Sequence, residues 1–266
     1  MSAVATREGS EFTDYDGFTV EYRDASHRYW IIKDGERISV PSVTGVEKVL
    51  AKDALIPWAE KMGVEGALRL ERAGQLNGIA IKDAVYAMRT YGEGASAKRD
   101  AGADRGTAIH DALRFYCEAG AVPNVGDFDE SVRGYVQALC KWLLKTAPEP
   151  VLVENVVGSW THGFAGRFDL LATIDGDLVL VDLKTSSGSA RVFKEAHLQV
   201  AGYELALEEC ELQKPARTLI VALGEDGSVR AVPARGSASD FLAVLACDRA
   251  LKALQSTLRA DEKAAA

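Results

Sequence analysis

Long apolar runs are missing from this sequence. No apolar stretch approaches the roughly 20 residues that a membrane-spanning helix needs. The N-terminus is polar and acidic, without the pattern of a signal peptide. We therefore expect no membrane partner and a cytoplasmic location.

The sequence has few cysteines, and no two of them are closely spaced. The four cysteines form no Cys-x-x-Cys pair and are widely spread, at Cys117, Cys140, Cys210 and Cys247. This spacing argues against a disulfide framework and against a zinc site. We expect most of them to be small core residues.

A surplus of positive charge is also absent. The chain has 31 Lys and Arg against 39 Asp and Glu, which gives a net charge of −8. This charge argues against a protein that coats nucleic acid non-specifically. It does not exclude an enzyme of nucleic acid, because metal ligands contribute acidic residues and a basic groove can exist on an acidic body.

The chain is organised around a predicted hairpin that starts at Gly166. Apolar residues lead to the dipeptide Asp175-Gly176, which supplies the positive φ angles of a tight turn. An apolar strand from Leu178 to Leu183 follows, and its valines favour extended backbone.

Three charged residues belong to this hairpin. Asp182 and Lys184 are two positions apart, so a strand places them on one face. Asp169 starts the partner strand and can reach the same face. Two carboxylates about 4 Å apart repel by roughly 4 kcal/mol at a protein-like dielectric, and a bound cation offsets that cost. Oxygen ligands favour Mg²⁺ or Mn²⁺; the alternative is a surface salt bridge between Asp182 and Lys184.

The rest of the chain predicts an α/β (α+β) fold with a central mixed sheet flanked by helices. We expect a loose arm over residues 1–16, a β-meander with a helical region over 17–105, a core over 106–258 and a tail over 259–266. Ser42 is the expected N-cap of a helix. Residues 92–102 are expected to form a flexible loop, either near substrate phosphates or as a solvated linker.

Further polar residues flank the hairpin. His110 lies beside the apolar stripe of a predicted helix, where a histidine is either structural or a ligand. Gln199 and Tyr203 are four apart and share a helix face. Glu154 belongs to the strand before the hairpin, and the sequence leaves open whether it lies near the metal.

Taken in chain order, these residues resemble the PD-(D/E)XK nuclease superfamily, and within it the RecB-like, phage-type exonuclease branch. The motif residues are His110, Asp169 in Gly-Arg-Phe-Asp, the triplet Asp182-Leu183-Lys184, and Gln199-x-x-x-Tyr203. The resemblance implies a restriction-endonuclease-like core over 106–258. Phe168 replaces the proline of the family motif, and aspartate stands at 182 where many relatives have glutamate.

The resemblance also implies roles for these residues. Asp169, Asp182 and the backbone carbonyl of Leu183 would bind Mg²⁺ or Mn²⁺, with His110 as a further ligand or as a group that supports the ligands. Lys184 would orient or help to deprotonate the attacking water.

Gln199 and Tyr203 would orient the catalytic lysine or hold the substrate backbone; the alternative for both is an ordinary packed helix face. Asp169, Asp182, Lys184, Gln199 and Tyr203 are thus the expected catalytic residues.

The activity so implied is a metal-dependent DNA exonuclease in recombination, replication or end processing. An endonuclease is the less favoured form of the same chemistry. Expected partners are DNA and, as an open choice, a single-strand annealing protein or another recombination or replication protein. No iron–sulfur cluster is expected, and a phage-encoded protein would act in the host cytoplasm. The competing hypothesis is an inactive nucleic-acid-binding or assembly module of the same fold.

Overall fold

The computed structural model describes residues 3–7, 9–50, 55–75, 78, 80–90 and 95–265. Contacts divide the chain into two compact units, one of residues 1–50 with 112–266 and one of residues 51–111. This division differs from the expected boundary between residues 105 and 106, because the N-terminal strands belong to the same unit as the core.

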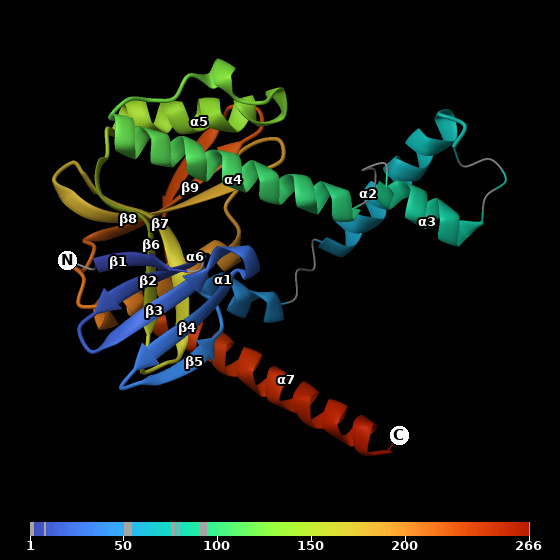
Figure 1. The fold of residues 1–266 in the computed structure, drawn as a ribbon. Coiled ribbons are helices and arrows are strands. Elements are labelled where there is room, and N and C mark those ends of the chain that lie inside the picture. The colour runs from blue at the N-terminus through green and yellow to red at the C-terminus, as the bar shows by residue number, and fades with distance from the viewer. Residues whose placement is uncertain are drawn as a thin grey trace. The chain divides into compact units, whose positions relative to one another are not determined.

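The N-terminal strands form a five-stranded antiparallel sheet in sequential order (Figure 1). Its strands are β1 (Ala3–Arg7), β2 (Ser10–Tyr15), β3 (Phe18–Arg23), β4 (Arg28–Lys33) and β5 (Glu36–Val40). The first two strands correct the expected loose arm over residues 1–16. β2 pairs with β3 along its whole length, and the Tyr15 ring packs 5.5 Å from that of Phe18. Pairing and packing of this kind outweigh a polar local sequence.

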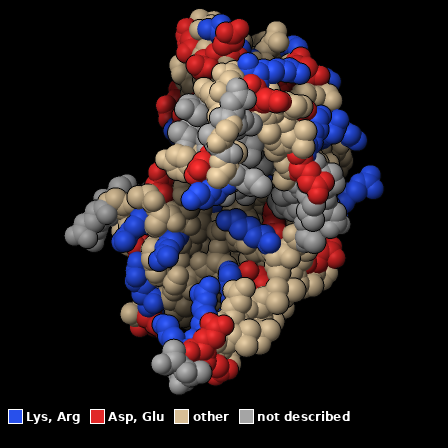
Figure 2. Space-filling model, turned by 90° about the vertical axis from the view of Figure 1, so that its right-hand side faces the viewer, with Lys and Arg blue, Asp and Glu red and all other residues tan. Residues whose placement is uncertain are grey.

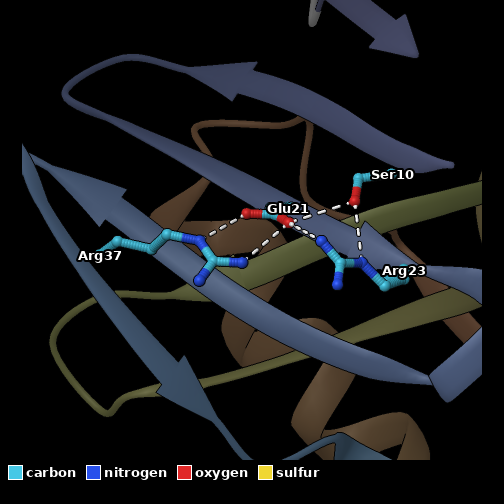
Figure 3. Close-up of polar contacts among 4 residues, drawn as sticks. All are labelled: Ser10, Glu21, Arg23 and Arg37. Atoms are coloured by element: carbon cyan, nitrogen blue, oxygen red, sulfur yellow. Dashed lines mark hydrogen bonds and ion pairs between the residues drawn. The ribbon is translucent and has the colours of Figure 1, made fainter. Parts of the chain in front are cut away.

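One face of this sheet carries a buried carboxylate bound by arginine (Figure 3). Glu21 is only 3% exposed and accepts hydrogen bonds from Arg37 at 2.7 and 2.9 Å. Ser10 donates to the same carboxylate at 3.2 Å, and Arg23 lies 3.7 Å away. The Arg37 guanidinium also lies over the Trp30 ring, 4.2 Å from its centroid. These contacts tie β2 to β5.

The second sheet is mixed, as predicted. Its order is β10-β9-β8-β7-β6, and only the β8–β9 pair is parallel among these neighbours. The strands are β6 (Glu149–Ser159), β7 (Phe164–Ile174), β8 (Asp177–Ser186), β9 (Arg217–Gly224) and β10 (Val229–Pro233). The predicted turn joins β7 to β8, with φ angles of 55° at Asp175 and 84° at Gly176. The predicted fold class is confirmed.

Helices pack against this sheet. The helix α6 (Lys194–Glu209) contacts β6 to β9, and α7 (Ala238–Ala265) packs on α6. The helix α5 (Glu130–Thr146) packs against β9 and β10. Gly134 permits this approach, because a Cβ there would lie 1.8 Å from the carbonyl oxygen of Glu225.

Short helical segments connect the larger elements. They are η1 (Asp24–Ser26), α1 (Val43–Val46), η2 (Glu47–Val49) and η3 (Val125–Asp127). The predicted N-cap is present: Ser42 Oγ accepts a hydrogen bond from the Gly45 amide at 2.9 Å. α1 and η2 follow β5 directly and lie in the same unit as both sheets.

The other unit contains α2 (Leu55–Arg72), α3 (Ile81–Thr90) and the first part of α4 (Ala95–Ala119). The expected flexible loop over 92–102 is therefore helical from Ala95, while residues 91–94 lie outside the described part. The expected tail over 259–266 is helical through Ala265. Both segments are rich in alanine and charged residues that favour helix. No helix in the described ranges is long and apolar enough to cross a membrane.

Candidate functional site

The register of the β7–β8 hairpin brings two acids together. The β7–β8 ladder ends at the pair of Leu170 and Val181, and Asp169 and Asp182 are the next residues beyond it on their strands. Both carboxylates act on the same two side chains, Lys184 and Tyr203, so the two acids belong to one cluster. Asp169 also accepts a hydrogen bond from the Leu183 amide at 2.6 Å, which fixes the carboxylate at the end of the hairpin.

A third acid extends this row onto β6. The ladder pairs Val153 with Leu170 and Asn155 with Phe168, which sets Glu154 opposite Asp169. One oxygen of Glu154 and one of Asp169 lie within 4.8 Å of each other. The sequence left the position of Glu154 open, because the register between two strands is not encoded in either strand alone.

The backbone at Glu154 is unusual. Its φ is 49°, a left-handed conformation that costs a non-glycine residue about 1–2 kcal/mol. Arg167 Nε lies 3.0 Å from Glu154 Oε2 and neutralises part of this acid's charge. Strained backbone of this kind is characteristic of functional sites.

Lys184 completes the cluster on β8. Its Nζ lies 2.7 Å from Asp182 Oδ2, and Asp182 is only 1% exposed. Because the acid is buried, the contact is not the exposed surface salt bridge that the sequence left open. Burial lowers the pKa of Lys184, but the carboxylates of Asp182 and Asp169 outweigh it, so the pKa is raised above its ordinary value.

The predicted pair on α6 also lies beside the acids. Gln199 Nε2 donates to Tyr203 Oη at 2.9 Å, and both side chains are buried. Burial, and then the charges of Asp182 and Asp169, raise the pKa of Tyr203 well above its ordinary value, so its phenol stays protonated.

Gly166 makes room for that tyrosine. A Cβ at this position would lie 2.7 Å from Tyr203 Cε1. Leu180, two positions before Asp182, belongs to the same buried cluster as Val200 and Tyr203. Asp182 therefore lies on the face of the sheet that α6 covers.

Glu47 is a further acid that the sequence did not single out. It lies on η2, is 7% exposed, and its charge contributes to the raised pKa of Lys184. In the sequence it stands in the segment Val-Glu-Lys-Val, where nothing distinguishes it from a surface glutamate.

His110 lies on α4 and is half-buried. It belongs to the unit of residues 51–111, at the end of that unit. The helix continues without a break into Ala112 and Leu113, which are fully buried in the other unit. Its role as a ligand, like that of the Leu183 carbonyl, stays a prediction.

The side chains present suit a hard divalent cation. Glu154, Asp169 and Asp182 offer carboxylate oxygens, the donors that Mg²⁺ and Mn²⁺ prefer. Arg167 pairs with Glu154, and Lys184 pairs with Asp182. A cation between the acids would offset the repulsion among their carboxylates.

A sequence profile described as the PD-(D/E)XK nuclease superfamily matches residues 125–264. The matched region is more than half of the chain and includes the whole acidic row, Lys184, Gln199 and Tyr203. A search of curated proteins found no match. The coverage of this profile shows that the chain belongs to the PD-(D/E)XK nuclease superfamily.

Proposed function

We propose that this protein is a Mg²⁺- or Mn²⁺-dependent DNA exonuclease. The observation that carries the proposal is the contact between Lys184 and the buried Asp182, at 2.7 Å, with the Asp169 carboxylate acting on the same lysine. Membership of a nuclease superfamily supports the reaction class. The exonuclease mode follows the resemblance of the motif order to the RecB-like, phage-type branch.

Asp169, Asp182 and the Leu183 carbonyl would hold the metal, and His110 would be an additional ligand. When bound there, the ion lowers the pKa of a coordinated water and neutralises charge on the scissile phosphate. The Leu183 amide keeps Asp169 in place through its 2.6 Å hydrogen bond. The proposal includes no iron–sulfur cluster, because the cysteines lack a clustered spacing.

The remaining residues act on the water and the substrate. Lys184 orients the attacking water or helps to take its proton, and its charge stabilises the negative charge that develops on phosphorus oxygens. Gln199 holds the Tyr203 hydroxyl by a hydrogen bond, and the pair supports the lysine or the substrate backbone.

The wider role that we propose is DNA recombination, replication or end processing in the cytoplasm, of the host if the protein is phage-encoded. A single-strand annealing protein or another recombination protein would be the partner.

The test compares linear, circular and single-stranded DNA incubated with Mg²⁺ or with a chelator. We expect Mg²⁺-dependent loss of linear DNA, sparing of closed circles, and abolition of the activity by Lys184→Met. Cutting of closed circles would replace the exonuclease by an endonuclease. DNA binding without any metal-dependent cleavage would instead support an inactive binding module.

A further inference from the structure

A groove with a volume of about 980 Å³ lies within the unit that holds both sheets. Its walls come from the start of β4, the end of β5, the α1–η2 segment and α7. It is lined by His27, Arg28, Ser39, Val40, Pro41, Ser42, Gly45, Lys48, Val49, Asp248, Arg249, Leu251, Lys252 and Gln255. Figure 2 shows Lys and Arg side chains gathered around a hollow in its lower half.

Positive charge predominates in the lining of the groove. Among the described lining residues the one acid is Asp248, and its carboxylate binds Lys252 Nζ at 2.7 Å. Among the described residues, Arg28 and Lys48 have no carboxylate within ion-pair distance, and both are exposed. Arg249 donates hydrogen bonds to the backbone carbonyls of His162 and Gly163. These acceptors are neutral, so they do not cancel the positive charge of the arginine.

The basic lining continues along α7. Lys252, Arg259 and Lys263 line an adjoining depression on the same helix. The distance from Arg249 to Lys263 along the helix axis is about 21 Å at a rise of about 1.5 Å per residue. That length matches about six base pairs of B-form DNA at about 3.4 Å each.

The groove adjoins the acidic site through η2. The turn η2 contacts α6, the helix of Gln199 and Tyr203, and its residue Lys48 lines the groove. The segment before α1 is joined to β7 as well, since the Ala165 amide donates to the Pro41 carbonyl at 3.1 Å. A polynucleotide in the groove would therefore lie beside segments that contact β7 and α6, two of the elements that carry the proposed catalytic residues.

The chemistry of the lining favours duplex over single-stranded DNA. Single strands are held largely by bases stacked on aromatic rings, and the described residues of the groove lining include no Phe, Tyr or Trp. The nearby Trp30 ring already lies beneath Arg37 and 5.4 Å from Arg23. Lysine and arginine side chains suit the phosphates of a backbone without reading sequence.

We infer that this groove binds the sugar-phosphate backbone of double-stranded DNA and leads it to the acidic site. The inference rests on the proposed function for its substrate class. It names a second binding surface, formed by the N-terminal sheet, η2 and α7, that is separate from the acidic row on β6, β7 and β8.

The test is the affinity for a short labelled duplex, measured by fluorescence anisotropy over a range of salt with a chelator present. We expect Arg28→Glu with Lys48→Glu to weaken duplex binding about tenfold or more. Arg28→Gln with Lys48→Gln, which removes charge without reversing it, should lower the slope of log affinity against log salt by about two. The matched control is Lys145→Glu with Arg230→Glu, which makes the same charge change at exposed positions outside the groove.

An unchanged affinity and slope in the groove variants would overturn the inference. So would an equal loss in the control pair, or a loss for single strands but not for duplex. Hydrolysis of a nitrophenyl phosphodiester by the wild-type protein tests the metal site separately, because this small substrate does not need the groove. If that hydrolysis fails, the proposed function fails, while the titration still decides whether the groove binds duplex.

Discussion

Asp169 is the residue whose loss most cleanly separates metal binding from folding. Asp169→Asn keeps an oxygen that can accept the Leu183 amide but removes one of the two neighbouring negative charges. The variant loses repulsion from Asp182 and attraction to Lys184, so we expect its stability without metal to stay close to that of the wild type. We also expect its affinity for Mn²⁺ to fall about tenfold or more, because ligand charge sets cation affinity.

Thermal unfolding without metal measures the stability, while calorimetric titration and the Mn²⁺-induced rise in Tm measure the affinity. The control is Asp177→Asn, which removes an exposed carboxylate at the start of the neighbouring strand, β8. An Asp169→Asn protein that binds Mn²⁺ as tightly as the Asp177→Asn protein would contradict the assignment.

Glu21 and Arg37 make a prediction about stability and pH. The hydrogen bonds from Arg37 lower the pKa of Glu21 below its ordinary 4.5, although burial opposes them. A lowered pKa contributes stability at pH values above about 4.5, and this contribution is lost as the pH falls through the folded-state value. Arg37→Met should therefore cost about 2 kcal/mol at neutral pH and less in acid.

Denaturant unfolding at several pH values checks this expectation. Arg217→Met is the control, because its ion pair with Asp177 is exposed on both sides and should contribute about 0.5 kcal/mol or less. Equal costs for the two arginines, or a cost that grows as the pH falls, would show that Glu21 is not stabilised in the way described.

At the scale of the element, β6 carries a strained residue at its functional position. Glu154→Gly and Glu154→Ala both remove the carboxylate, but only glycine adopts a φ of 49° without strain. We expect the glycine variant to be more stable than the alanine variant by about 1 kcal/mol. DNA cleavage should fall equally in both, because both lack the acid.

At Val153, where φ is not positive, the order should reverse, since glycine in a strand is less favourable than alanine. Thermal unfolding of the four variants gives the comparison. An alanine at position 154 that is as stable as glycine would mean that the backbone there relaxes readily.

The sequence predicted the site on these strands only in part. The Asp175-Gly176 turn and the apolar residues on either side of it are local signals, so they located the β7–β8 hairpin and placed Asp182 and Lys184 on one face. The partners of that face come from ladder register and from packing between distant segments. Glu154 and Glu47 were therefore not assigned to the site from sequence, and the strand β2 was missed because its polar residues hide a fully paired strand.

At the scale of the whole molecule, the N-terminal sheet shares its core with the second sheet. Val20 and Ile31 belong to the same buried cluster as Val157 and Phe164. The two sheets are so close that a Cβ at Gly158 would lie 2.9 Å from a methyl group of Val20. The resemblance to the family implied a core over 106–258 without these strands, and contacts between separate sheets leave no periodic signal in the sequence.

Deletion of residues 1–40 should therefore unfold the remaining chain, since it exposes this shared core to water. Deletion of residues 259–266 should leave the fold intact, because residues 259–263 of α7 are exposed. Near-ultraviolet circular dichroism and thermal unfolding distinguish the two proteins. A cooperative transition in the protein that lacks residues 1–40 would show that the second sheet is independent.

The central claim is that acids from neighbouring strands hold a divalent cation beside Lys184. Anomalous diffraction from a crystal soaked in Mn²⁺ tests it most directly. The account predicts one strong peak at coordination distance, about 2.0–2.6 Å, from carboxylate oxygens of both Asp169 and Asp182. A peak bound elsewhere, or no peak at a Mn²⁺ concentration that supports cleavage, would contradict it.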